Sequence, residues 1–523
     1  MKFLGSLIIG VFCAATVGFS ENWPQGMGPN VDFAIESGEG LHLKWSASLD
    51  ENVAWRTTLP ETGQSTPVVW GDRVFLTTMK PVEADATVGN DTVAYCLSAT
   101  DGKILWERPI AGGYMTKLSG PFSDASSPPA MTDGTHVWFL NPTGRIVCFD
   151  FEGKEVWNRE VTSCARTQPM LFDGKLIFHR QVYLPDEKGH FEHSNKDAPL
   201  EKWTQLQALD ANSGELVWIS ECGVNMGSCP MVQHLDDGTA VIVVGRGGGH
   251  GPPEPEGISM IGAKDGKTIW SLELPGYMST QTFPIADGQA LIFHKNDHLW
   301  VDVKTGKISK TVSVVENVLV RRRTEEGRET VTETLELKKP RPITQGSNLR
   351  VGDFHYFRSY TRNYLGRVNV KFGAVEYLEL PLQVSREKGA AEQVLWNAEH
   401  RKADLAVSTN KKTKKGLSYT SLKFNDMMNS RGFKVSGDAR DIGNGWGHTA
   451  SAAPTAFGNR LMVPLLSGMV FVIQADAEVL DEKAVMAIND LGPLGQAYSR
   501  ASVSTDGSLV FGRTIREVIA FGE

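Results

Sequence analysis

The sequence of 523 residues lacks several features that would assign it to a common protein class. Beyond its first 20 residues it has no apolar run near the roughly 20 residues that a membrane-spanning helix needs. Its formal net charge of −8 argues against a nucleic-acid partner, because such proteins present an excess of Lys and Arg. His-Glu-x-x-His and zinc-type Cys/His spacings are absent as well, which removes the common zinc-site motifs.

The first 20 residues are the exception to this shortage of apolar runs. They carry one lysine, an apolar stretch and small residues at Gly18 and Ser20, a pattern typical of a secretory signal peptide. An uncleaved anchor fits less well because the stretch is short, and lipidation of Cys13 fits less well because the preceding Phe12 is bulky. We therefore predict cleavage of residues 1–20, a formal charge of −9 for the mature chain, and a periplasmic or secreted location.

Against these absences stands one phrase that recurs along the chain. It consists of a Gly-Lys or Gly-Glu turn, two further residues and tryptophan, and it is clearest at Ser213-Gly-Glu-Leu-Val-Trp218. Its tryptophans are Trp55, where only the end of the phrase is kept, Trp106, Trp157, Trp218 and Trp270. A period of about 50 residues built from short β-rich runs is typical of a propeller or solenoid.

A second phrase, a small hydroxyl residue followed two positions later by proline, opens each unit. It is intact at Ser65, Ser127, Thr167, Ser228 and Thr282, and it is eroded near residues 346, 452 and 500. Each unit then contains two strands joined by a tight turn, a variable loop, a third strand, the Gly-Lys turn and a fourth strand. Four antiparallel strands make one propeller blade. The eight units predict an all-β fold, an eight-bladed β-propeller of four-stranded antiparallel blades.

The two ends of the chain are complementary in this scheme. The last unit, residues 500–523, stops after three strands, whereas residues 52–60 match a fourth strand and precede the first complete unit. We therefore predict that the N-terminal strand completes the last blade and leaves no open sheet edge. The repeated tryptophans are expected to pack between neighbouring blades with their indole N–H groups hydrogen-bonded locally.

The repeats argue for one large domain, although length alone would suggest about three. We predict a signal peptide at residues 1–20, an extended N-terminal segment at residues 21–51, and a single propeller over residues 52–523. Two insertions are expected within the propeller, at about residues 313–342 and 382–447. We expect the protein to be a monomer.

Five cysteines remain after signal cleavage, at positions 96, 148, 164, 222 and 229. An odd number in an exported protein leaves at least one free thiol or an intermolecular bond. Cys96 and Cys148 occupy matching third-strand positions, where a small apolar residue suits a core. Cys222 and Cys229 bracket a connection between blades and are the better disulfide candidates, while the pairing among Cys96, Cys148, Cys164, Cys222 and Cys229 stays open.

The openings and closings of these units resemble the PQQ-like repeat of tryptophan-docking propellers. That family includes quinoprotein alcohol dehydrogenases and a non-catalytic scaffold of outer-membrane β-barrel assembly. The start of the mature chain, Asn22-Trp-Pro-Gln-Gly-Met-Gly-Pro-Asn30, is similar to the Trp-Pro-Gln-Trp-Arg-Gly-Pro-Asn opening of secreted propellers from planctomycete-type bacteria, with Gly26-Met27 in place of Trp-Arg. The resemblance covers nearly all of the mature chain and implies the fold, but fold does not fix chemistry.

For catalytic members, the resemblance implies PQQ held beside two sequence-adjacent cysteines, Ca²⁺ bound by Glu and Asn, and an Asp base. This sequence has no Cys-Cys dipeptide and no Cys-x-x-Cys-His for haem attachment. We therefore favour a protein with no catalytic residues, no metal ligands and no assigned cofactor. The alternative is a PQQ- and Ca²⁺-dependent alcohol or sugar dehydrogenase with an altered site.

All the long loops of this scheme fall on one face of the predicted disc, which indicates a binding face. Residues just ahead of the first strands are expected at the mouth of the axial channel on that face. The candidate ligand-binding residues are Arg166, Gln281, Trp446, His448, Tyr498 and Arg500. They could bind an anionic or planar ligand or a peptide segment, or they could cap the channel by bonding one another and water. The sequence thus predicts an exported scaffold that binds a protein segment or a carbohydrate at the cell envelope through its long-loop face.

Overall fold

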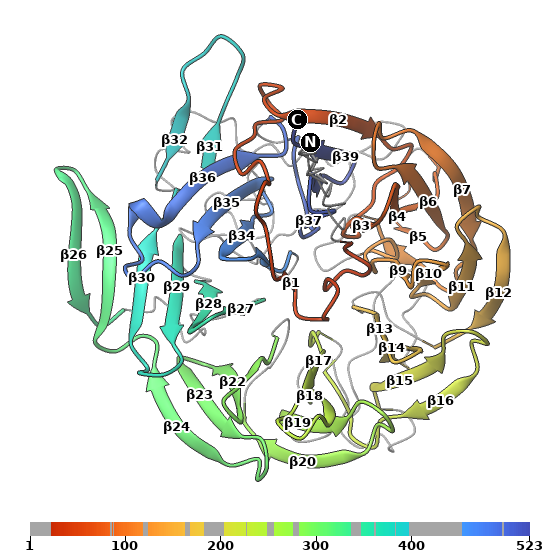
Figure 1. The fold of residues 1–523 in the computed structure, drawn as a ribbon, viewed down its shortest axis with the longest axis horizontal. Helices are drawn as coiled ribbons and strands as arrows, with labels where there is room; N and C mark the ends of the chain where they lie inside the picture. The colour runs from red at the N-terminus through yellow and green to blue at the C-terminus, as the bar shows by residue number, and fades with distance from the viewer. Residues whose placement is uncertain are drawn as a thin grey trace, which may run out of the picture.

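Eight β-sheets stand around a central axis in the computed structural model of the chain (Figure 1). The structure describes residues 22–83, 86, 88–118, 124–162, 168–181, 203–225, 227–247, 256–275, 282–335, 347–359, 362–381, 383–396, 452–493 and 496–523. Each sheet holds four strands in antiparallel order, and two of the sheets carry additional strands. The predicted eight-bladed, four-stranded propeller is therefore confirmed. Within these ranges no helix is long and apolar enough to cross a membrane.

The strands of each blade follow one another from the axis outward. Blades 1 to 4 comprise β3 (Val68–Trp70), β4 (Arg73–Met79), β6 (Thr92–Ser98) and β7 (Ile104–Ile110); β9 (Met131–Thr132), β10 (His136–Asn141), β11 (Arg145–Asp150) and β12 (Glu155–Glu160); β13 (Met170–Phe172), β14 (Lys175–Arg180), β15 (Gln205–Asp210) and β16 (Leu216–Ile219); and β17 (Met231–His234), β18 (Ala240–Arg246), β19 (Gly257–Gly262) and β20 (Thr268–Glu273).

The other four blades follow the same order. Blades 5 to 8 comprise β21 (Ile285–Ala286), β22 (Gln289–His294), β23 (Asp297–Asp302) and β24 (Ile308–Ser313); β27 (Leu349–Val351), β28 (Phe354–Arg358), β29 (Tyr364–Asn369) and β30 (Val375–Glu379); β33 (Thr455–Phe457), β34 (Arg460–Pro464), β35 (Met469–Gln474) and β36 (Val485–Asp490); and β37 (Ser504–Thr505), β38 (Val510–Arg513), β39 (Glu517–Phe521) and β2 (Val53–Thr58). A short pair, β5 (Val88–Gly89) and β8 (Thr116–Lys117), lies beside blade 1.

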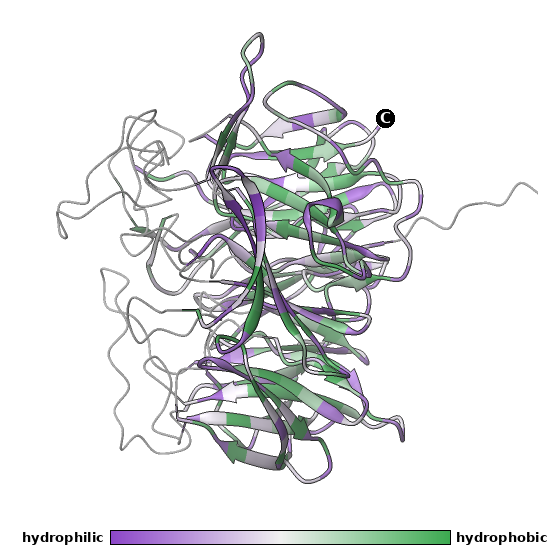
Figure 2. Ribbon diagram, turned by 90° about the vertical axis from the view of Figure 1, so that its left-hand side faces the viewer, coloured by the Kyte–Doolittle hydropathy of each residue, from purple (hydrophilic) through white to green (hydrophobic). Residues whose placement is uncertain are grey.

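The middle strands are apolar on both faces because each blade is packed between two others. In β4 every residue after Arg73 is buried, and β11 is buried from Ile146 to Phe149. The outer strands instead alternate, so that β12 buries Trp157 and exposes its neighbours. Viewed edge-on, hydrophobic residues run along the strands that cross the disc (Figure 2). Strands covered on both faces require such continuous apolar runs.

The repeated tryptophans dock each blade onto the next, as predicted. Four of the five indole N–H groups donate to the carbonyl that follows the third strand of the neighbouring blade: Trp55 to Ala99 (2.7 Å), Trp106 to Phe151 (2.9 Å), Trp157 to Ala211 (3.0 Å) and Trp270 to Val303 (2.7 Å). Trp218 packs against Gly266 in the same way, but its indole N–H has no hydrogen-bond partner among the described residues, so the predicted local bond is missing there. The glycine of the next Gly-Lys turn lies against the ring, as Gly306 does against Trp270. The two halves of the repeated phrase thus contact each other across every such interface.

Blades 5 and 6 lack the docking tryptophan, and other aromatic side chains make the hydrogen bond to the next blade. Lys310 stands at that position on β24, and Trp300 of the third strand donates to Val370 O of blade 6 at 3.0 Å. The Lys310 ammonium lies 4.6 Å from the Trp300 ring centroid, a cation–π contact. On blade 6, Tyr356 OH donates to Ala475 O of blade 7 at 2.8 Å. In these two blades an aromatic side chain of another strand therefore supplies the donor to the next blade.

Two glycines of blade 5 allow this docking contact to be tested. Gly306 and Gly288 have nearly equal left-handed φ angles, 66° and 69°, so alanine meets the same backbone penalty of roughly 1–2 kcal/mol at either site. A methyl group added at Gly306 would lie 2.8 Å from Trp270 Cδ2. A methyl group added at Gly288 would have no other side-chain or backbone atom within 4 Å among the described residues. We expect Gly306→Ala to lower the free energy of unfolding by roughly 1–3 kcal/mol more than Gly288→Ala in urea titrations. Equal losses would mean that the ring does not rest on the glycine.

The ring closes as predicted, with the N-terminal strand β2 as the outer strand of blade 8. Strand β2 pairs antiparallel with β39, from Val53 opposite Phe521 to Thr58 opposite Glu517. Trp45, which precedes β2, stacks on Phe521 with ring centroids 4.9 Å apart. The two ends of the chain therefore share one sheet and one core.

Residues 22–52, here called the N-terminal strap, cross the centre of the disc before reaching β2 (Figure 1). Trp23 exchanges two backbone hydrogen bonds of 2.9 Å with Val69 on blade 1. Farther along, β1 (Ala34–Ile35) pairs parallel with β33 on blade 7. Trp23, Met27 and Phe33 are buried, so the strap closes part of the axial channel with apolar side chains.

The strap then binds blade 7 through one carboxylate. Asp490 Oδ2 accepts from Ser46 Oγ at 2.6 Å and from Arg386 at 3.0 Å, and Asp490 Oδ1 accepts from Ser48 Oγ at 2.7 Å. Arg386 belongs to the segment after β31 (Gln383–Ser385), which pairs with β32 (Gln393–Leu395). Asp490 thus joins blade 7 to both the strap and this hairpin.

Blade 6 carries an outer hairpin where an insertion is predicted at about residues 313–342. Strands β25 (Val318–Thr324) and β26 (Gly327–Glu333) form it, and β25 pairs parallel with β30. Glu376 of β30 accepts from the buried Arg367 and from Arg321 of the hairpin. Most of the other predicted insertion, residues 382–447, lies outside the described residues.

Candidate functional site

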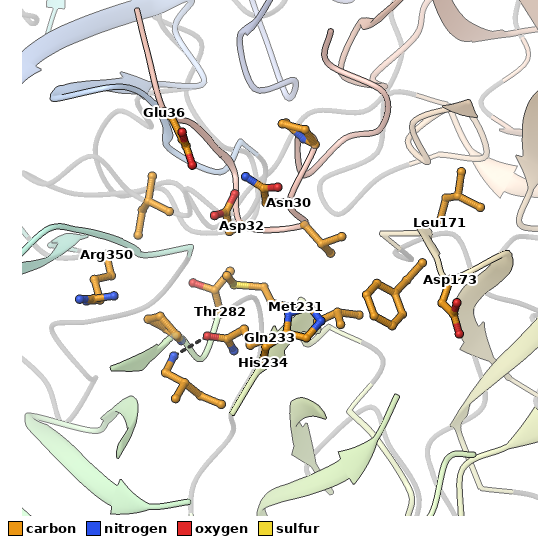
Figure 3. Close-up of a pocket in the computed structure, with 17 residues that line it drawn as sticks. Asn30, Asp32, Glu36, Leu171, Asp173, Met231, Gln233, His234, Thr282 and Arg350 are labelled. Atoms are coloured by element: carbon orange, nitrogen blue, oxygen red, sulfur yellow. Dashed lines mark hydrogen bonds between the residues drawn. The ribbon is translucent and has the colours of Figure 1, made fainter. Parts of the chain in front are cut away.

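An axial pocket of about 660 Å³ lies between the strap and the inner strands of blades 3 to 6. Asn30 and Asp32 of the strap line one side, and Gln233, His234 and Thr282 of the blades line the other (Figure 3). The lining reaches the ends of β13, β17 and β27, next to the turns that join first and second strands. The pocket therefore opens on the face that carries the short turns.

The strap presents its side chains through an unusual backbone. Val31 and Phe33 have φ angles of 60° and 62°, a region that bulky and β-branched residues rarely adopt. Both side chains are buried in the core, which holds this conformation in place. Asp32 lies between them on the pocket wall, and its Oδ1 accepts from Ala34 N at 3.0 Å. Burial raises the pKa of Asp32 above its usual range.

The opposite wall consists of amide, hydroxyl and ring groups in fixed positions. Gln233 Nε2 donates to Phe283 O at 2.8 Å, and its Oε1 accepts from Ile285 N. The Phe172 and His234 rings lie with centroids 5.8 Å apart at the pocket edge. These contacts orient the polar groups before any ligand arrives, which favours tight recognition.

Acidic groups outnumber basic ones around the pocket. Three carboxylates, those of Asp32, Glu36 and Asp173, line it, whereas the basic side chains in the lining are Arg350 and His234. Lys175 pairs with the Asp173 carboxylate at 2.8 Å and lowers the pKa of that carboxyl. The strap side, with Asp32 and Glu36, is therefore the negative side of the pocket.

A buried polar chain continues from the pocket wall into the core of blades 5 and 6. Thr282 Oγ1 donates to Asn348 Oδ1 at 2.7 Å, and the same oxygen accepts from His355 Nε2 at 2.6 Å. His355 Nδ1 then accepts from His298 Nε2 at 2.9 Å. Both histidines are neutral in this arrangement, because burial lowers the pKa of His298 to about 3 and lowers that of His355 well below its ordinary value.

Of the six candidates predicted from sequence, the two that the structure describes, Tyr498 and Arg500, do not line this pocket. Arg166, Gln281, Trp446 and His448 lie outside the described residues. Tyr498 and Arg500 are buried, and an Arg500 guanidinium N–H donates to Tyr498 OH at 3.4 Å. The long-loop face on which all six were placed stays a prediction. Sequence reasoning missed the pocket residues because most of the strap precedes the first repeat unit and carries no catalytic motif. The one available signal was the Asn22–Asn30 phrase.

The predicted disulfide between Cys222 and Cys229 is wrong. Both cysteines are free and buried, as are Cys96 and Cys148, while Cys164 lies outside the described residues. The Cys229 sulfur lies 4.0 Å from the sulfur of Met27 in the strap, within the apolar core. Burial raises the pKa of the Cys229 thiol to about 12, so it is an inert core residue.

The comparisons with known proteins agree with the propeller fold. A family profile described as "Outer membrane protein assembly factor BamB" matches residues 30–170, 89–207 and 202–317, which is more than half of the chain. The chain belongs to the PQQ-like β-propeller family. A comparison with curated protein sequences gives no match.

Solved structures in this family are distant in sequence. Quinohemoprotein alcohol dehydrogenase ADHIIG from Pseudomonas putida HK5 is 12% identical, with 96% of this chain and 80% of that chain covered and a TM-score of 0.50. BamB from Moraxella catarrhalis is 11% identical, with 90% and 98% covered and a TM-score of 0.44. Identities this low show a shared fold alone.

The described residues do not fit PQQ and calcium, the cofactors of the dehydrogenase branch. They contain no group of three His, Cys, Asp or Glu side chains that could hold a metal ion. PQQ is a tricarboxylate, and the axial pocket places Asp32 and Glu36 where an anion would meet like charge. The sequence-adjacent cysteines of that branch are also missing from the whole chain.

Proposed function

We propose that the protein is a binding propeller of the cell envelope that holds a carbohydrate in its axial pocket and performs no chemistry on it. The observation that supports this most is the pocket itself. Its volume lies within the range of about 300–1,000 Å³ that small-molecule sites occupy. Amide, hydroxyl, carboxylate, guanidinium and ring groups converge on it, and these groups match the hydroxyls and C–H faces of a sugar.

Two other readings are weaker. A protein segment would need apolar anchor pockets, and the polar wall of Gln233, His234 and Thr282 offers few. A PQQ-dependent dehydrogenase requires a cofactor that the described residues do not fit. An envelope location rests on the predicted signal peptide and on the family that includes an outer-membrane assembly factor.

A panel of neutral, amino and acidic oligosaccharides tests the proposal by isothermal titration calorimetry. We expect at least one class to bind, and Phe172→Ala to weaken it at least tenfold by removing the ring at the pocket edge. Phe372→Ala is the matched control, because Phe372 is 79% exposed on a distant turn. Melting temperatures report whether either variant disturbs the fold.

Three results would contradict the proposal. If none of the oligosaccharides binds, the pocket is not a carbohydrate site. Capture of an envelope protein that oligosaccharides do not displace, and that Phe172→Ala leaves unchanged, would favour a partner on another surface. Reduction of a dye by alcohols or sugars after addition of PQQ and Ca²⁺ would restore the dehydrogenase.

A further inference from the structure

The strap wall of the axial pocket carries a chemical preference that the rest of the pocket does not. Its two ionisable groups that line the pocket, Asp32 and Glu36, are both acidic. The opposite wall supplies neutral donors and acceptors from Gln233 and Thr282. Away from the strap, the Asp173 carboxylate is paired with Lys175 and Arg350 is cationic, so a ligand that spans the pocket meets negative charge without a paired cation at the strap wall.

Asp32 is fixed more firmly than an ordinary surface carboxylate. The strap pairs with blade 7 on its C-terminal side, where Ala456 N donates to Phe33 O at 2.9 Å. On its N-terminal side Met27 is fully buried against Cys229. Between these anchors, the left-handed Val31 and Phe33 direct their side chains into the core and leave Asp32 on the wall. The fold retains the backbone cost of these two left-handed residues because their side chains are buried.

The Asp32 carboxylate is also incompletely compensated. Its hydrogen bonds within the described residues come from backbone N–H groups, those of Ala34 and of Asp32 itself, and no cation is paired with it there. Desolvation outweighs those bonds and disfavours the charged form. Asp173, by contrast, has Lys175 as a partner at 2.8 Å. A cationic group on the ligand would form an ion pair with Asp32, as Lys175 does with Asp173.

We propose that the axial pocket selects a saccharide that carries a protonated amine, with the amine held by Asp32 and Glu36 and the sugar hydroxyls by Gln233 and Thr282. This inference rests on the proposed carbohydrate function and names the class of sugar. The net charge of the whole chain, −8, also attracts a cationic ligand at long range.

The test compares three trisaccharides of equal length and linkage: β-1,4-linked glucosamine, its fully N-acetylated form, and glucose. Calorimetry at pH 6 and low salt keeps the amines charged. We expect the glucosamine trimer to bind at least tenfold more tightly than either neutral trimer, and 0.3 M NaCl to reduce this preference.

Asp32→Asn keeps the acceptor for Ala34 N and removes the charge. We expect it to abolish the preference for the amine while changing the affinity for the glucose trimer less than twofold. Asp287→Asn is the control for the same Asp-to-Asn change, since Asp287 lies in a short turn and does not line the pocket. Glu36→Gln provides a second reading should Asp32→Asn lower the melting temperature.

The outcomes separate this inference from the function beneath it. Equal binding of charged and neutral trimers would contradict the proposed selectivity for an amine but not the proposed binding of carbohydrate. An amine preference that survives Asp32→Asn and Glu36→Gln would do the same. Tighter binding of the N-acetylated trimer would overturn the selectivity for an amine as well. Failure of all three trimers and of the wider oligosaccharide panel would overturn the carbohydrate itself.

Discussion

Deleting residues 21–60 should abolish cooperative folding and give an aggregating product. The deletion removes β2 and so exposes the edge of β39 and the face of blade 1 that Trp55 covers. It also removes Trp23, Met27 and Phe33 from the axial core, each of which is at most 2% exposed. Loss of one such aromatic alone costs about 3–5 kcal/mol, and total stability is only about 5–15 kcal/mol.

The measurement is size-exclusion chromatography with thermal melting followed by circular dichroism. A chain that begins at residue 22 serves as the control, because it keeps the strap and β2, and we expect it to remain soluble and to melt cooperatively. A soluble, cooperatively melting 21–60 deletion would show that seven complete blades and one three-stranded blade form a stable ring, against the closure argument.

The fold could be predicted because its information is local and repeated. Tight turns, apolar strands and docking tryptophans recur in one order, so an error in one unit is corrected by the others. The same logic predicts the closing strand, since the last unit lacks a strand that residues 52–60 supply. At Lys310, where the repeat lacks its tryptophan, Trp300 of the neighbouring strand makes the hydrogen bond to the next blade. No pattern in the sequence indicated this replacement.

The pocket could not be predicted because its defining residues belong to no repeat. The path of residues 22–36 depends on tertiary contacts such as Met27 with Cys229. Left-handed conformations at Val31 and Phe33 run against local preference, so propensity alone gives the opposite expectation. The disulfide prediction failed for a related reason, since chain spacing does not say which way two side chains point.

The departure from the family opening at Gly26-Met27 has a physical basis in the structure. A side chain at Gly26 would collide with Pro129, which opens blade 2. Met27 meanwhile fits a fully buried site beside Cys229. The phrase Asn22–Asn30 therefore acts as an anchor that holds the strap in place, and its last two residues line the pocket together with Val31, Asp32 and Glu36.

Lowering the pH from 7 to 5 should destabilise the protein strongly, because three histidines are buried in the neutral form. Burial lowers the pKa of His179 to about 4 and that of His298 to about 3, and it lowers that of His355 well below its ordinary value. In the unfolded chain these groups titrate near 6.5. The unfolded state therefore binds protons first as pH falls, and stability is complete above pH 6.5 and lost progressively below it, down to about pH 4 for His179 and about pH 3 for His298.

Each neutral histidine contributes a loss of about 1.4 kcal/mol per pH unit in this window, or about 2 kcal/mol at pH 5. Urea titrations between pH 7 and pH 5 measure the slope. His179→Gln keeps a side-chain donor without a titrating group, so we expect its free energy of unfolding to fall less steeply with pH by one proton's share. His42→Gln, at a half-buried site in the strap, is the control for the His-to-Gln change itself. Identical slopes for His179→Gln and wild type would mean that His179 takes up protons equally in the folded and unfolded states, which would contradict a buried neutral His179.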